Sequence, residues 1–324
     1  MPMRPIALTC GDPSGVGPEL AVAARNALGS EVPFFWIGDP RHLPAGAAIQ
    51  EIATPADAAS VSATSLPVLR HDFAALAFPG QPNDANAAGV IAVIERAVTL
   101  VQSGQAGGVC TAPIHKKALK DGAGFAFPGH TEFLAHLAGV DHVVMMLASP
   151  LLRVVPVTIH IAIADVPKAL TADLLETSIR ITAASLQRDF GIAKPRLAIA
   201  GLNPHAGEGG AMGHEEITLI TPVLDRLRAE GYRLAGPASA DTMFHPRARA
   251  GYDAAICMYH DQALIPIKTL DFDGGVNVTL GLPFVRTSPD HGTAYDIAGQ
   301  GIARPDSLIA ALRMAAEMAA ARGQ

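Results

Sequence analysis

Three histidines occupy equivalent places in the sequence, and their side chains could bind a metal ion. His160, His205 and His260 each come directly or shortly after a run of Val, Ile and Ala typical of a buried strand. Ligands of α/β proteins gather where strands end, and neutral imidazole binds Zn²⁺, Co²⁺ and similar ions. We interpret the three as a candidate metal triad that leaves coordination positions open. The alternative is that each is a structural histidine, which is the commoner role of a single strand-end imidazole.

A second group of residues could bind an anion. Gly129 is followed by His130 and Thr131 where an apolar helical pattern begins. Backbone N–H groups at a helix start attract anions, and the hydroxyl and imidazole would add side-chain donors. The alternative is an ordinary helix start, with Gly129 in the turn and Thr131 as the capping residue.

A third group combines two cations with an amide. Lys268 and Arg286 lie in apolar surroundings, and Asn277 interrupts a strand pattern. Buried charges are costly without partners of opposite charge. Those partners could be a phosphate or carboxylate of a substrate, or structural Asp and Glu residues.

Two glycine-rich loops are similar to nucleotide-binding loops without matching them. The loop 11–19 follows the first strand pattern and precedes a helix pattern with Pro18 at its start, and the other loop is 207–213. Neither has the G-x-G-x-x-G spacing, and no G-x-x-x-x-G-K-[ST] motif occurs. A dinucleotide would therefore bind without the standard fingerprint. His42, His71 and His142 lie in polar surroundings and are expected at the surface.

Short apolar runs alternate with longer helical patterns, which predicts an α/β fold with a largely parallel sheet. The expected strands are Ile6–Thr9, Phe34–Ile37, Gly108–Thr111, Val143–Ala148, Val154–His160, Leu197–Leu202, Ala254–Tyr259 and Val276–Leu280. The expected helices are Asp84–Ser103, Thr171–Phe190, His214–Glu230 and Asp306–Arg322. No linker marks a boundary, so interleaved lobes and consecutive domains are both compatible with the pattern.

Composition excludes several classes of function. The chain of 324 residues has a formal charge of −6 and no basic run, so nucleic acid is not an expected partner. Three cysteines, far apart, fit a reducing compartment. Residues 143–166 are too interrupted by Pro, Arg and His to span a membrane, and no signal peptide is evident. We therefore expect a cytoplasmic protein.

The blocks above occur in an order that resembles the PdxA family, the 4-hydroxythreonine-4-phosphate dehydrogenases of vitamin B6 biosynthesis. The resemblance extends from about Ile6 to the final helix and shows no family motif across 39–82. The blocks that carry it are 9–19 (TCGDPSGVGPE), 111–116 (TAPIHK), 129–133 (GHTEF), 201–210 (GLNPHAGEGG), 240–244 (ADTMF), 258–262 (MYHDQ) and 275–288 (GVNVTLGLPFVRTS).

That resemblance implies a fold and an assembly. It implies a single catalytic unit over residues 1–324, made of two interleaved lobes in an α/β/α arrangement similar to isocitrate and isopropylmalate dehydrogenases. It also implies a homodimer with active sites at the subunit interface, where both subunits share the metal ligands His160, His205 and His260.

The resemblance implies the chemistry as well. The expected reaction is oxidation by NAD or NADP, then decarboxylation, of a small phosphorylated hydroxy amino acid, with Zn, Mg or Co as the divalent metal. The expected substrate contacts are His130, Thr131, Lys268, Asn277 and Arg286. Lys268, Asp241 or a metal-bound water could accept the proton. The alternatives are a paralogous dehydrogenase of four-carbon sugar-acid phosphates such as D-erythronate or D-threonate 4-phosphate, a class-II-type metal lyase, and a non-catalytic binder of a phosphorylated ligand.

Overall fold

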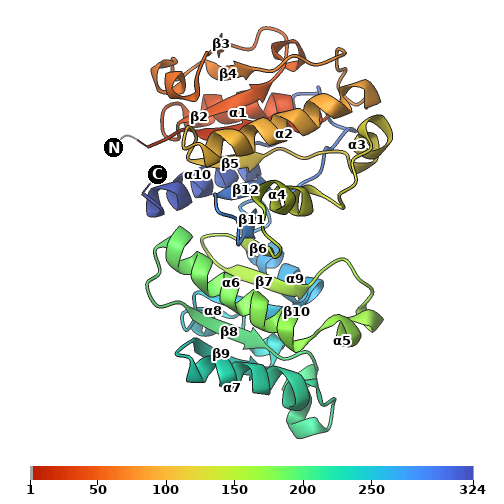
Figure 1. The fold of residues 1–324 in the computed structure, drawn as a ribbon, viewed down its shortest axis with the longest axis vertical. Helices are drawn as coiled ribbons and strands as arrows, with labels where there is room; N and C mark the ends of the chain where they lie inside the picture. The colour runs from red at the N-terminus through yellow and green to blue at the C-terminus, as the bar shows by residue number, and fades with distance from the viewer. Residues whose placement is uncertain (1–2, 324) are drawn as a thin grey trace. The chain divides into compact units, whose positions relative to one another are not determined.

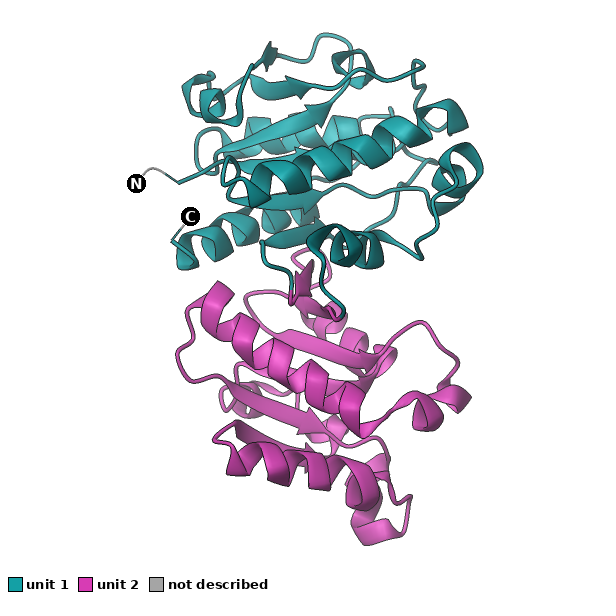
Figure 2. Cartoon of the chain, viewed as in Figure 1, with its two compact units in different colours: residues 1–141, 282–324 teal, residues 142–281 magenta. Residues whose placement is uncertain are grey.

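A computed structural model describes residues 3–323 of the chain. The chain forms two compact units (Figures 1 and 2). Unit 1 comprises residues 1–141 and 282–324, and unit 2 comprises residues 142–281. Unit 1 is therefore discontinuous in sequence, because unit 2 is inserted between its α4 and its last strand.

The described residues of unit 1 form a parallel sheet in the order β3-β4-β2-β1-β5-β12. Because all of these strands run the same way, the loops that follow them emerge at one edge. The strands are β1 Ile6–Thr9, β2 Phe34–Gly38, β3 Ile49–Glu51, β4 Leu66–Arg70, β5 Gly108–Thr111 and β12 Arg286–Pro289. Residues of β1, β2 and β5 are all buried, which explains their continuous apolar sequence.

Helices cover both faces of this sheet. Helix α10 packs against β12, β5 and β1 and contacts α1, while α2 packs against β1, β2 and β5. Figure 1 shows α2 in front of the strands. The helices are α1 Gly17–Leu28, α2 Ala87–Gln102, α3 Lys116–Ala123, α4 His130–Ala138 and α10 Asp306–Ala321, with the short turns η1 Pro40–His42, η2 Pro55–Ser60 and η3 Asp84–Asn86.

The described residues of unit 2 form a mixed sheet in the order β11-β6-β7-β10-β8-β9. Strands β7, β10, β8 and β9 are parallel, whereas β6 is antiparallel to both β11 and β7. The strands are β6 Val144–Ala148, β7 Arg153–Thr158, β8 Arg196–Ala200, β9 Arg233–Ala238, β10 Ala254–Tyr259 and β11 Val276–Leu280.

The long helix α6 packs on β6, β7 and β11, and α9 packs on β6, β7 and β10. Side chains of β10 alternate, so that Ala255 and Cys257 enter a core with Leu264 and Ile267 of α9. The helices are α5 Val166–Ala169, α6 Ala172–Phe190, α7 Thr221–Ala229, α8 Pro246–Arg249 and α9 His260–Leu270, with η4 Ile163–Asp165, η5 Pro204–Gly210, η6 Glu216–Ile220 and η7 Ala240–Thr242.

The expected α/β fold is confirmed, with two kinds of correction. Four strands were missed (β3, β4, β9 and β12), since each is short, exposed or contains proline. Helices α3, α5, α8 and α9 were also missed. Helix α9 was not recognised because Pro266 lies inside it and it begins at His260, directly after the strand pattern. Among residues 3–323 there is no helix with the length and apolar character that a membrane crossing requires.

Candidate active site

The three histidines follow three neighbouring strands of unit 2. Strand β10 lies between β7 and β8 and is parallel to both, so His160, His205 and His260 follow strands that end at one edge of the sheet. Side chains connect these ends. Thr158 donates its hydroxyl to the carbonyl of Met258 at 2.7 Å, which holds the end of β7 to the end of β10.

The structure brings His160 and His260 together. Their ring centroids are 5.6 Å apart, and both rings line a cavity of 240 Å³. The Nδ1 atom of His260 lies 2.7 Å from a carboxylate oxygen of Asp261. A carboxylate on one ring nitrogen fixes the ring and directs the other nitrogen toward a ligand position. His160 has a φ of 54°, an uncommon backbone conformation for a residue other than glycine.

His205 lies on a separate turn with unusual backbone geometry. Residues 205–209 all have positive φ, including the non-glycine residues His205, Ala206 and Glu208. The turn is held by the buried carboxylate of Glu216, which accepts from the backbone N–H of Asn203 at 2.8 Å and from its side-chain amide at 2.9 Å. His205 itself is exposed, so the support for this backbone conformation comes from the hydrogen bonds between Asn203 and Glu216.

Among residues 3–323, no three His, Cys, Asp or Glu side chains of one chain converge to hold a metal ion. One chain therefore supplies a pair of imidazoles, His160 and His260, without His205. Two imidazoles side by side, one of them oriented by a carboxylate, fit a partial coordination set for Zn²⁺ or a similar ion. These donor atoms suit a metal ion whose remaining ligands are groups other than this pair of side chains.

The other expected residues of unit 2 lie on three elements, η7, α9 and the strand β11. Asp241 belongs to η7, which lies against the turn η5 that carries His205, and its carboxylate accepts from Ser239 Oγ at 2.5 Å. Lys268 lies on the last turn of α9, with its Nζ 5.6 Å from the centroid of the Phe272 ring. Asn277 lies on β11 and is half-buried.

Unit 1 contains a cationic cluster where the sequence predicted an anion site. Arg286 is 4% exposed and donates from Nη2 to the hydroxyl of Thr111 at 2.7 Å. The Nε2 atom of His130 is buried without a hydrogen-bond partner in the structure. Lys116 passes close to Gly129, since a Cβ at that glycine would lie 3.3 Å from the Lys116 Nζ. Helix α4 begins at His130, so its positive dipole end adds to this cluster.

Burial and mutual repulsion set the protonation states in this cluster. Burial, followed by repulsion from Arg286 and Lys116, holds the pKa of His130 well below its usual range, so the imidazole is neutral at pH 7. Burial lowers the pKa of Arg286 to about 10, and its guanidinium remains charged. Capping of α4 by Thr131 is excluded, since Gly129 is the N-cap residue and no side chain caps the helix. A cluster with permanent charge and an unpartnered donor or acceptor suits a phosphate or carboxylate.

A model of the family "Pyridoxal phosphate biosynthetic protein PdxA" matches residues 30–315. The chain belongs to the PdxA family. It is 68% identical over 98% of its length to a 4-hydroxythreonine-4-phosphate dehydrogenase of Paracoccus denitrificans, covering 99% of that protein. A relative with the same name from Roseobacter denitrificans is 64% identical, with 98% and 97% coverage. A crystal structure of the Klebsiella pneumoniae enzyme of that name superposes with a TM-score of 0.90 at 36% identity, covering 98% of this chain and 99% of the other.

Sequence reasoning missed several residues that position the site of this PdxA chain. Thr111 and Lys116 lie in the block TAPIHK, which signalled the family but no individual role. Asn203 and Glu216 support the His205 turn from thirteen residues apart. Gln262 joins two strand ends. A pairing between distant polar residues leaves no periodic signal in the sequence. Only a position within one of the family blocks could have pointed to such a residue.

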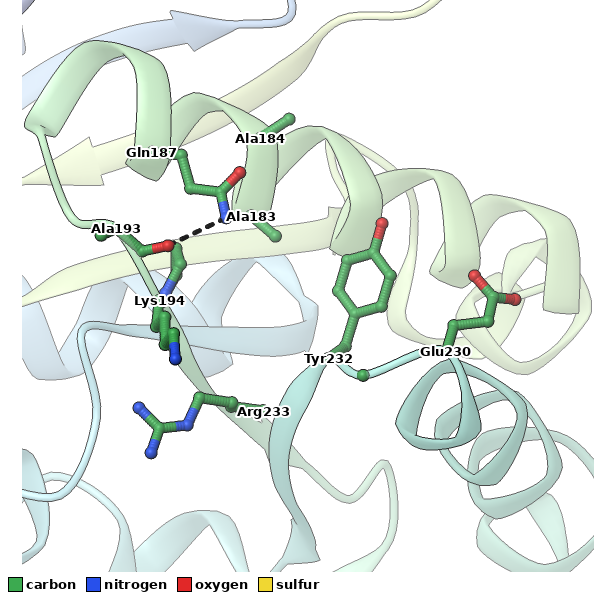
Figure 3. A pocket seen from close by; sticks show the side chains of 10 residues that line it. Ala183, Ala184, Gln187, Ala193, Lys194, Glu230, Tyr232 and Arg233 are labelled. Carbon is green, nitrogen blue, oxygen red and sulfur yellow. Dashed lines mark hydrogen bonds between the residues drawn. The ribbon is translucent and has the colours of Figure 1, made fainter.

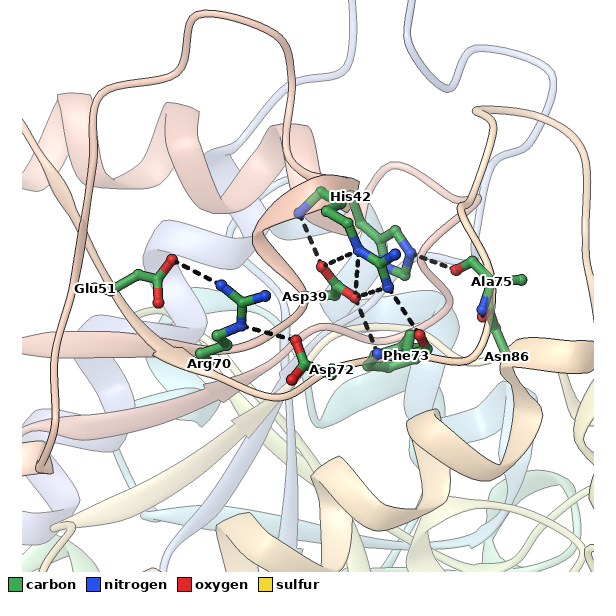
Figure 4. A network of polar contacts seen from close by, with 9 residues as sticks. Asp39, His42, Glu51, Arg70, Asp72, Phe73, Ala75 and Asn86 are labelled. Carbon is green, nitrogen blue, oxygen red and sulfur yellow. Dashed lines mark hydrogen bonds and ion pairs between the residues drawn. The ribbon is translucent and has the colours of Figure 1, made fainter.

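His42 was expected at the surface and is buried, being 8% exposed. It packs edge-on against Phe73, with ring centroids 5.1 Å apart, and its Nε2 lies 3.0 Å from the carbonyl of Ala75. Figure 4 shows it beside the carboxylate of Asp39. The polar sequence around His42 concealed this burial, because the residue faces inward from the turn η1 that follows β2. His71 is half-buried and His142 is exposed, so both reach the surface as expected.

A further cavity of unit 2 lies at the opposite end of β8 from His205. It has a volume of 480 Å³, and Lys194 and Arg233 line it together with Gln187 and Tyr232 (Figure 3). Lys194 precedes β8, whereas His205 follows it, so this cavity is separate from the histidine edge.

Proposed function

We propose that this PdxA protein oxidises and decarboxylates 4-phosphohydroxy-L-threonine to 3-amino-2-oxopropyl phosphate, with NAD or NADP as acceptor and a divalent metal ion as activator. This reaction would supply a precursor of pyridoxal 5'-phosphate. The observation that carries the proposal is the cluster in unit 1 of the buried guanidinium of Arg286, the exposed Lys116 and the neutral imidazole of His130, which fits a phosphate. Relatives with the corresponding activity in their names support the substrate.

Arg286 and α4 would hold the phosphate. Arg286 is oriented by Thr111 and cannot lose its charge at neutral pH, so it presents a fixed cation to the dianion. His130 is neutral, and its buried Nε2 can donate one hydrogen bond to a phosphate oxygen as the Nε2–H tautomer. Thr131 adds a hydroxyl on the same helix turn. Lys268 and Asn277 are proposed to orient the carboxylate and amine of the substrate.

His160, His205 and His260 are proposed to hold the metal ion, with His160 and His260 from one subunit of a homodimer and His205 from its partner. The proximity of the first two rings within one chain supports this division. When bound, the cation would supply Lewis-acid activation of the hydroxyl that is oxidised and would neutralise charge on the resulting keto oxygen. Lys268 and Asp241 are the candidate proton acceptors, and Asp241 lies on the turn packed against that of His205.

The test is an assay of the purified protein with 4-phosphohydroxy-L-threonine, each cofactor, and Mg²⁺, Zn²⁺ or Co²⁺, with absorbance of the reduced cofactor as the readout. We expect reduction only when metal, phosphate ester and cofactor are all present. D-Erythronate 4-phosphate and D-threonate 4-phosphate are the competing substrates. Higher kcat/KM with either of them would replace the proposed substrate, and turnover without a nicotinamide cofactor would favour a lyase.

A further inference from the structure

A pocket of 430 Å³ lies in unit 1 at the sheet edge where strands end. It is framed by the loop after β1, by the turn after β2 and by the segment after β12. Two hydrogen bonds join the segment after β1 to the segment after β12: Gly299 N–H donates to Glu19 Oε2 at 3.0 Å, and Val16 N–H donates to the Thr293 carbonyl at 3.0 Å. Ligands of parallel sheets bind at such edges, and the volume is within the range of small-molecule sites.

Two buried polar atoms of the pocket lining have no hydrogen-bond partner among the described residues. One is Glu19 Oε1, a carboxylate oxygen, and the other is His42 Nδ1. Because His42 Nε2 lies 3.0 Å from the Ala75 carbonyl, Nε2 carries the hydrogen and Nδ1 presents a lone pair. Both atoms are therefore acceptors. Buried acceptors are normally satisfied, so the complementary ligand must bring hydroxyl or amino hydrogens.

The cation of the lining is already engaged. Arg41 donates to Asp39 Oδ2 at 2.6 Å and to the Phe73 carbonyl at 2.8 Å. Asp39 itself is fully buried and also accepts the Phe73 N–H at 2.9 Å, so it holds Arg41 in place. Lowering of the His42 pKa by burial keeps that imidazole neutral. Among the described lining residues, Glu19 is then the charged group without an ion pair.

We propose that this pocket binds the adenosine end of the nicotinamide cofactor and selects NAD⁺ over NADP⁺, with Glu19 as the specificity-determining residue. The ribose hydroxyls and the adenine amino group supply the hydrogens that Glu19 Oε1 and His42 Nδ1 lack. A 2'-phosphate supplies acceptors and negative charge instead, and it would face the Glu19 carboxylate beside an Arg41 guanidinium that is already paired with Asp39. Helix α1 begins at the same pocket with Pro18 in its first turn, which places a positive dipole end toward the cofactor phosphates.

The inference rests on the proposed function in naming a nicotinamide cofactor, but its test does not require turnover. Binding of ADP-ribose and of 2'-phospho-ADP-ribose to the full-length protein is measured by titration calorimetry. Neither probe contains nicotinamide, so an enzyme inactive on the proposed substrate would still report on the pocket. We expect ADP-ribose to bind at least about tenfold more tightly than its 2'-phosphate.

Two variants locate the binding site. Glu19→Gln removes the charge while keeping an acceptor for Gly299, and we expect the preference for ADP-ribose to fall by about tenfold. Ala77→Trp places a large ring in the pocket, and both probes should lose binding. The matched controls are Glu31→Gln and Ala53→Trp, which lie outside the pocket lining and should behave as wild type.

Melting curves followed by circular dichroism establish whether each variant is folded. If Ala77→Trp does not fold, the binding preference of Glu19→Gln alone tests the inference. Equal binding of the two probes to the wild-type protein would overturn the inference. Unchanged preference in folded Glu19→Gln, or unchanged binding in folded Ala77→Trp, would overturn it as well.

Discussion

The side-chain amide of Gln262 donates to the backbone carbonyl of Gly201 at 2.8 Å. Its carbonyl oxygen accepts from the backbone N–H of Met258 at 2.7 Å. Gln262 lies in the first turn of α9, two residues after His260, and Gly201 directly follows β8 on the way to His205. One buried side chain thus connects the end of the strand that precedes His260 to the end of the strand that precedes His205.

Replacement of this amide should loosen the histidine edge. In Gln262→Leu the buried Gly201 carbonyl and Met258 N–H lose their partner, and we expect the free energy of unfolding in urea to fall by about 2 kcal/mol. Metal affinity, measured by competition with a chromophoric chelator, should fall with it. The control Gln187→Leu removes an exposed amide that bonds only Ala193, so it should change stability by less than about 0.5 kcal/mol. Equal losses of unfolding free energy in Gln262→Leu and Gln187→Leu would show that the hydrogen bonds of Gln262 contribute no more to stability than those of an exposed amide.

Subunit mixing tests how the proposed metal ligands are divided. His160→Ala and His205→Ala should each be inactive alone, but mixed and refolded together they should recover part of the wild-type rate. Each heterodimer would contain one site with all three imidazoles. His160→Ala mixed with His260→Ala should recover nothing, because these rings lie 5.6 Å apart in one chain and would serve the same site. Recovery in the second mixture, or none in the first, would contradict the proposed division.

Arg286→Lys tests the phosphate cluster while keeping the charge. Lysine cannot bond Thr111 and a phosphate oxygen with the same planar geometry, so KM for the phosphorylated substrate should rise about tenfold or more. We expect a smaller change in kcat. Arg313→Lys is the control, since Arg313 is exposed and pairs with Glu31. An unchanged KM in Arg286→Lys would remove Arg286 from the phosphate site.

The buried carboxylate of Asp39 should make stability depend on acid pH. Burial alone would raise the pKa of Asp39, but hydrogen bonds from Arg41 and Phe73 hold it well below its usual range. A depressed pKa stabilises the folded state above the unfolded-state value of about 3.9, and this stabilisation is lost as the pH falls below it. At pH 7, Asp39→Asn should lower the free energy of unfolding by about 2 kcal/mol. The difference between variant and wild type should shrink from pH 5 toward pH 2, and a difference independent of pH would contradict this account.

Much of the fold was predictable because its strands are apolar and its helices periodic. The bounds of β1, β5, β10 and β11 agree with the sequence pattern. The antiparallel orientation of β6 was not predictable, since a buried strand has the same sequence pattern in either direction. For the site, the strand-end positions of His160, His205 and His260 followed from the sequence. The close approach of His160 to His260 did not, because it depends on strand order and on a positive φ that histidine rarely adopts.

The insertion of unit 2 before β12 has a consequence for biosynthesis. The ribosome completes β5 long before β12, which pairs with it through Arg286 and Thr287. Until the segment that begins at Leu282 is made, the β5 edge of the first sheet has no partner, and such edges favour association with other chains. Arg286 is also the buried cation of the proposed phosphate site. The nascent chain therefore acquires the strand β12 and the guanidinium proposed to bind phosphate in the same late step, and a product truncated before β12 would lack both.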